Sequence, residues 1–193
     1  MIGNGAGHHG GAGSVACPLV FIPGLGDDAE SWDGLAEELA AEHVCVALDH
    51  PTLLKDTSIA EMARAVRAEV VRKAPTPVVL VGCSMGSAIC QEWVLQQPGD
   101  VAALVLIAGW AGPDPLLDLV LGHWIALAEA GHRGTLAASG AALTFSAAYL
   151  RAHPEAAREC EIGDLRGNGA GLPKPRCARQ VATDRGAHAG GER

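Results

Sequence analysis

The order of apolar and polar residues along the chain predicts strands that alternate with helices. Apolar runs without a polar residue at every second position indicate strands buried on both faces. Such runs occupy residues 17–22, 44–48, 78–81 and 101–108. Between them apolar residues recur at helical spacing, as in the segment that Ser58 and Glu61 open as a capping box. Strands joined through helices require crossover connections, so the pattern predicts an α/β fold with a parallel sheet.

The third apolar run leads directly into the strongest chemical motif of the chain. Gly82, Ser84 and Gly86 follow the run at once, and helical spacing begins at Ala88 and Ile89. The order strand, sharp turn, helix is typical of a nucleophile elbow, whose glycines let strand and helix approach closely while the turn exposes the serine hydroxyl. The partial positive charge of the helix N-terminus favours an anion there. The alternative interpretation is a structural glycine turn without chemistry.

Residues 19–26, followed by Ser31, Trp32 and Leu35, resemble the oxyanion loop and first helix of the α/β-hydrolase superfamily. The elbow fits the same group, and the nearest members are small lactonases, esterases and non-haem haloperoxidases. The resemblance implies an α/β-hydrolase-type parallel sheet, with its central strands only, in the spatial order second, first, third, fourth. It also implies a helical cap over residues 113–159, for which the alternative is a plain helical tail packed on the sheet.

The resemblance extends from about residue 18 to residue 108, more weakly to Glu159, and is absent at both ends. We therefore expect a disordered glycine-rich leader (1–16), a hydrolase core (17–112), a cap region (113–159) and an irregular, disordered tail (160–193). The family would have two more strands in the tail, one carrying the catalytic acid and one leading to the catalytic histidine. A truncation, a shifted reading frame and a natural disordered tail all fit this segment.

The resemblance implies a serine hydrolase of small ester or lactone substrates that forms an acyl-enzyme on Ser84. The backbone N–H groups of Leu25 and Met85 would bind the oxyanion, and neither a cofactor nor a metal is implied. The alternative is a catalytically incomplete hydrolase remnant, or a non-catalytic module that binds a small molecule. A histidine base within reach of Ser84 would distinguish the two.

The base and the acid are harder to place than the nucleophile. His188 lies in a Gly-Ala-His sequence weakly similar to the family's histidine turn, but no strand precedes it. Asp114 follows the fourth run and is expected to cap the next helix rather than act as the acid, and Asp49 is expected to be structural. Surface or locally satisfied positions are expected for His43, His50, His123, His132 and His153.

Composition and charge narrow the possible partners. The net charge is −8, and residues 1–160 hold 8 Lys and Arg against 18 Asp and Glu. An acidic body argues against nucleic acid and anionic membranes. No apolar run reaches the roughly 18 residues of a membrane span, no secretion signal is visible, and the six cysteines lack metal-ligand spacing. These features predict a cytoplasmic protein without disulfides, whose partner is a small molecule; they do not determine its oligomeric state.

Overall fold

The computed structural model describes residues 17–49, 57–112 and 114–159. The expected leader and tail lie outside the described residues, as do His50 and His188. The boundaries expected for the core and the cap region therefore stay predictions. No helix within the described ranges is long and apolar enough to cross a membrane.

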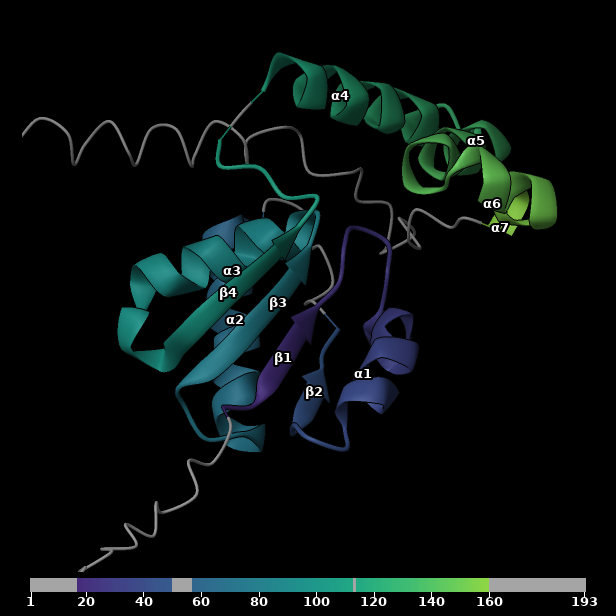
Figure 1. Ribbon diagram of the computed structural model, residues 1–193. Helices are drawn as coiled ribbons and strands as arrows, with labels where there is room; N and C mark the ends of the chain where they lie inside the picture. Colours follow the sequence, from purple (N-terminus) through teal and green to yellow (C-terminus); the bar gives the residue numbers. More distant parts are fainter. Residues whose placement is uncertain (1–16, 50–56, 113, 160–193) are drawn as a thin grey trace, which may run out of the picture.

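Four parallel strands form one sheet, as the apolar runs predict (Figure 1). They are β1 (Leu19–Ile22), β2 (Cys45–Ala47), β3 (Val78–Cys83) and β4 (Val101–Ile107), in the order β2-β1-β3-β4. This order confirms the expected spatial sequence of second, first, third and fourth. Because all four strands are parallel, the residues that follow the neighbouring strands β1 and β3 lie together at the carboxyl ends of the strands.

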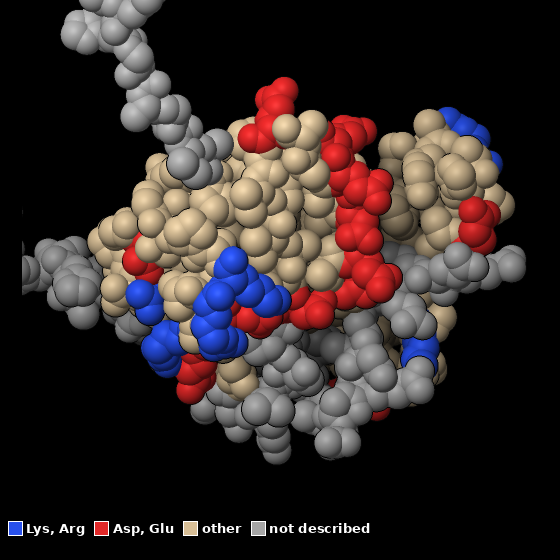
Figure 2. Space-filling model, turned by 90° about the horizontal axis from the view of Figure 1, so that it is seen from below, with Lys and Arg blue, Asp and Glu red and all other residues tan. Residues whose placement is uncertain are grey.

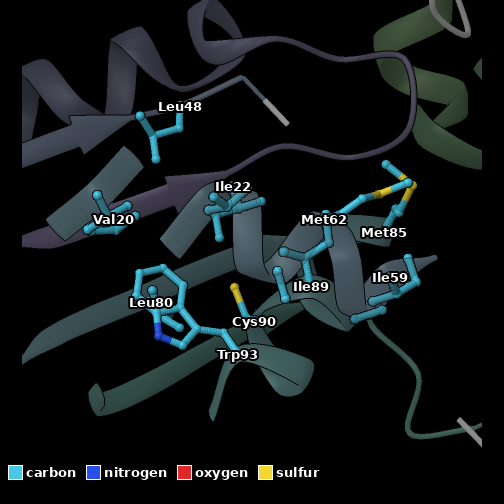
Figure 3. Packing of buried hydrophobic residues seen from close by; sticks show 14 of the residues in the cluster. Val20, Ile22, Leu48, Ile59, Met62, Leu80, Met85, Ile89, Cys90 and Trp93 are labelled. Atoms are coloured by element: carbon cyan, nitrogen blue, oxygen red, sulfur yellow. The ribbon is translucent and has the colours of Figure 1, made fainter. Parts of the chain in front are cut away.

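Two helices cover one face of the sheet, α2 (Ile59–Lys73) and α3 (Met85–Gln96). The main apolar cluster lies between them and the strands (Figure 3), and includes Val20, Ile22, Leu80, Met62, Ile89 and Trp93. Ser58 begins α2 as the sequence predicts: its hydroxyl accepts from the Glu61 N–H at 3.2 Å, and its own N–H donates to the Glu61 carboxylate at 2.8 Å. A capping box of this kind fixes the first turn of the helix.

The opposite face is covered over β1 by a short 3₁₀ helix, η1 (Ala29–Trp32), and the following α1 (Asp33–Leu39). Phe21 points to this face because its neighbours Val20 and Ile22 point to the other. Its ring lies 5.2 Å from that of the buried Trp32. The loop that begins at the carboxyl end of β1 is therefore anchored at Trp32, ten residues after Ile22, by a buried aromatic side chain.

The last part of the described chain is helical. It comprises α4 (Pro115–Glu129), α5 (Arg133–Thr144), α6 (Ala147–Ala152) and α7 (Ala156–Glu159). Figure 1 shows these helices grouped together beyond the carboxyl end of β4. The helical pattern read from the sequence is thus confirmed, while the role of these helices as a cap stays a prediction.

The prediction that residues 101–108 are buried on both faces is wrong. No residue of β4 is buried, and Val105, Leu106 and Ile107 are 46%, 41% and 42% exposed. The physical reason is position: β4 is at the edge, and among the described residues only β3 pairs with it. An apolar run indicates that the side chains of a strand are suited to a buried position. It does not indicate whether another strand or helix lies beside that strand and buries it.

Candidate active site

Ser84 occupies a strained turn between β3 and α3. Its φ is 50° and its ψ is −115°, and it is one of two non-glycine residues in the described ranges with a positive φ. A non-glycine residue in such a conformation costs on the order of 1–3 kcal/mol and persists only where the surroundings determine it. The strand therefore ends in the sharp strand–turn–helix geometry that the motif predicts.

Two glycines make this turn possible because their neighbours leave no room for a side chain. A Cβ on Gly82 would lie 2.5 Å from the Gly86 carbonyl oxygen and 2.7 Å from the Cys90 sulfur. A Cβ on Gly86 would lie 2.2 Å from the Ile22 oxygen and 2.5 Å from the Pro23 oxygen. Gly86 thus lets the start of α3 approach the end of β1.

The elbow is also joined to β4 by hydrogen bonds. The Ser84 N–H donates to the Ile107 oxygen at 2.9 Å. The fully buried Ser87 hydroxyl lies 2.7 Å from the Gly82 oxygen and 3.1 Å from the Ile107 oxygen. Gly109 is close as well, since a Cβ there would lie 2.5 Å from the Ser87 Cβ. The sequence analysis did not assign Ser87 a role, although its place directly after the motif was a usable signal.

The loop after β1 lies beside the serine. A Cβ on Gly24 would lie 3.4 Å from the Ser84 Cβ. Leu25 follows, half-buried against the main apolar cluster. Met85 is the first residue of α3, where backbone N–H groups have no partner within the helix. The nucleophile and both expected oxyanion donors thus come from two adjacent segments, and their roles stay predictions.

Residues 19–189 match the alpha/beta hydrolase family. The chain belongs to this family. The match reaches 30 residues beyond Glu159, farther than the resemblance seen in the sequence analysis, and so includes the segment with His188.

Curated relatives include the pimeloyl-[acyl-carrier protein] methyl ester esterase of Salmonella heidelberg. It is 29% identical over 113 residues, which cover 53% of this chain and 44% of the relative. The chain thus spans less than half the length of the curated relatives it matches.

Solved structures show the same hydrolase fold. A thermophilic esterase from Thermogutta terrifontis has a TM-score of 0.65 at 19% identity, covering 89% of this chain and 65% of the esterase. An N-acyl homoserine lactone degrading enzyme has a TM-score of 0.62 at 20% identity, covering 86% and 64%. At these identities the likeness concerns the fold alone.

A serine hydrolase needs a base for its nucleophile, and no histidine in the described part of the chain is hydrogen-bonded to Ser84. His43 precedes β2, which is the edge strand opposite β4, whereas Ser84 follows the interior strand β3. His132 and His153 flank α5 and α6, and His123 is within α4. No hydrogen bond joins any of these four described histidines to the Ser84 hydroxyl. His188 and His50 lie outside the described residues.

The two aspartates considered for the acid have structural partners. The Asp114 carboxylate accepts from the Leu116 N–H at 2.7 Å and caps α4, as expected. Asp49 accepts from the Ala29 N–H at 2.8 Å, which joins the end of β2 to the loop after β1. Within the described ranges no group of three or more His, Cys, Asp or Glu could hold a metal ion.

Cys83, the residue before Ser84, has a thiol whose pKa is raised by its surroundings. Burial raises the pKa of the Cys83 thiol, and the negative charge of Asp27 raises it further. Cys83 directly precedes Ser84, so the charge of Asp27 acts at the nucleophile's neighbour. The sequence analysis did not identify Asp27, because Asp27 is far from the elbow in sequence although it lies close to it in the fold.

Proposed function

We propose that this protein is a serine hydrolase of small ester or lactone substrates. The observation that carries the proposal is Ser84, held at a positive φ beside the Gly24 loop and at the start of α3. The esterase name of the curated relatives supports an ester substrate, and the lactone-degrading neighbour shares the fold.

The chemistry follows from the arrangement of these groups. The Ser84 hydroxyl attacks the carbonyl carbon, a base takes its proton, and the carbonyl oxygen becomes an oxyanion that accepts hydrogen bonds from the Leu25 and Met85 N–H groups. Collapse of this intermediate releases the alcohol, which takes the proton from the base, and leaves an acyl-enzyme. Water then hydrolyses the ester on Ser84 by the same steps.

Covalent labelling tests the role of Ser84. We expect a fluorophosphonate probe to label the unmodified protein and not the Ser84→Ala variant, with mass spectrometry locating the adduct. Ser31→Ala, which removes an exposed hydroxyl from η1, is the matched control and should label normally. Unchanged labelling of Ser84→Ala would remove the serine from this role.

A second function is favoured by the histidine positions in the described ranges. A hydrolase remnant or binding module would keep the elbow and turn over esters weakly, because oxyanion donors alone leave roughly 10³–10⁴-fold acceleration over water. This alternative predicts weak hydrolysis of a simple aryl ester. Turnover of about 1–10³ per second that His188→Ala abolishes would instead assign the base and establish the hydrolase.

A further inference from the structure

Ser87 is the only residue with a hydroxyl, amide or charged side chain that is buried in the described part of the chain. Its hydroxyl donates to the Gly82 oxygen at 2.7 Å and also lies 3.1 Å from the Ile107 oxygen. A hydroxyl has one proton and both neighbours are acceptors, so the shorter contact with Gly82 is the main hydrogen bond. Because a buried hydroxyl is unfavourable without a partner, the fold holds the Ser87 side chain in this arrangement.

The main hydrogen bond of Ser87 spans the elbow. Gly82 comes two residues before Ser84 and belongs to β3, whereas Ser87 comes three residues after Ser84 and belongs to α3. The Ser84 oxygen also accepts from the Ser87 N–H at 3.0 Å. Ser84, with its strained φ of 50°, is thus enclosed between two joined points of the backbone. A residue keeps such a conformation only where its surroundings determine it, and the Ser87 side chain supplies part of that constraint.

Ser87 also contacts the end of β4. The Ile107 oxygen accepts from the Ser84 N–H at 2.9 Å, and the Ser87 hydroxyl approaches the same oxygen. Ala108 follows with a φ of 49°, the other positive value for a non-glycine residue in the described ranges. Gly109 then passes so close that a Cβ there would lie 2.8 Å from the Ser87 Oγ. The two strained residues thus follow β3 and β4, and the Ser87 hydroxyl is hydrogen-bonded to both of these strands.

We propose that Ser87 is a positioning residue for the nucleophile: its hydroxyl joins α3 to β3 and β4, and thereby fixes the backbone conformation of Ser84. The proposal rests on the proposed function. Ser87 is fully buried, so it acts through Ser84 and not by contact with the substrate. Its loss should therefore slow the reaction at Ser84 without weakening the binding that precedes it. Misplacement of a reacting group by about 1 Å costs roughly 10²-fold in rate, so a decrease of about 10- to 100-fold is expected.

Ser87→Ala tests this role because it removes the hydroxyl and leaves the Ser84 side chain unchanged. The measurement is the rate of covalent labelling at Ser84 by an alkyl fluorophosphonate over a range of probe concentrations. An uncharged probe is used because the chain has a net charge of −8, and Figure 2 shows Asp and Glu side chains gathered in a band on one face. We expect the saturating rate to fall about 10- to 100-fold and the half-saturating concentration to stay the same.

Two further variants make the test specific. Ser87→Cys keeps a donor, although a weaker one, so its rate should lie between those of Ser87→Ala and the unmodified protein. It also carries the test if Ser87→Ala does not fold. The matched control is Val70→Ala, which shortens a fully buried side chain in the last turn of α2. This control should lower the melting temperature but leave the labelling rate unchanged, at a temperature where thermal melts show every variant folded.

The outcomes separate the two proposals. If the probe does not label Ser84 in the unmodified protein, the proposed function fails and this inference fails with it. If Ser87→Ala is labelled at the unmodified rate, or if Val70→Ala is labelled as slowly as Ser87→Ala, only the positioning role is overturned. A change confined to the half-saturating concentration would overturn it as well, since that change reports binding. A lower saturating rate in Ser87→Ala that Ser87→Cys partly restores supports the role.

Discussion

Replacing Gly86 with alanine should destabilise the protein because the new methyl group would meet backbone atoms. It would lie 2.2 Å from the Ile22 oxygen and 2.5 Å from the Pro23 oxygen, whereas carbon and oxygen need more than 3 Å. Neither oxygen can move without shifting the end of β1 away from α3. Overpacking costs about 1–3 kcal/mol and occasionally more, and contacts this short with two backbone oxygens belong at the upper end of that range. The helix propensity of alanine returns at most about 1 kcal/mol, so a net loss of about 2 kcal/mol is expected.

Urea denaturation and a thermal melt of Gly86→Ala measure this cost. A loss of 1 kcal/mol lowers the melting temperature by about 2–4 °C in a chain of this size, so we expect a decrease of several degrees. Gly122→Ala is the matched control because a Cβ there meets nothing within 4 Å inside α4. That variant should be more stable by roughly 0.5–1 kcal/mol. Equal melting temperatures for Gly86→Ala and the unmodified protein would refute the reasoning.

Three further outcomes are expected. Ser58→Ala should lower the free energy of unfolding by about 1 kcal/mol in a urea titration. Separately, the hydrogen bond from the Ser58 backbone holds the pKa of the Glu61 carboxyl below its usual 4.5, so the stability that the Glu61 carboxylate adds is present above pH 4.5 and is lost as pH falls through the lowered pKa. Burial raises the pKa of the Cys90 thiol to about 12, so in native protein at pH 8 iodoacetamide should modify the half-buried Cys17 well before Cys90, as followed by mass spectrometry. The chain should self-associate through the exposed side of β4, and Leu106→Lys should raise the monomer fraction in sedimentation; a monodisperse unmodified monomer would contradict this.

The sheet could be predicted from sequence wherever a strand is covered on both faces. Val78, Leu80 and Val81 are buried, as their continuous apolar run indicates. The same reasoning failed at β4, where Val105 is 46% exposed although its run is equally apolar. Burial of a strand depends on what pairs and packs beside it, and a local pattern does not contain that information.

The elbow could be predicted because its geometry depends on residues that are close together in the sequence. Gly82, Ser84 and Gly86 define the turn through their spacing and through the strand and helix on either side. Ser87 and Asp27 escaped the same reasoning because their contacts are not local: Ser87 reaches Ile107, 20 residues away. A catalytic base would be harder still to predict, since no short motif links a histidine to a distant serine.

One carbonyl group of β4, that of Ile107, contacts two serines of the elbow at once. The Ile107 oxygen lies 2.9 Å from the Ser84 nitrogen and 3.1 Å from the Ser87 hydroxyl, at the last residue of an edge strand. Strand ends at a sheet edge open locally at a lower free energy than interior strands. If the end of β4 frays by a single peptide, both serines lose this acceptor at once. We therefore expect the Ser84 backbone to stay aligned no longer than the end of β4 stays closed, and the rate of amide hydrogen exchange at the end of β4 would measure that time.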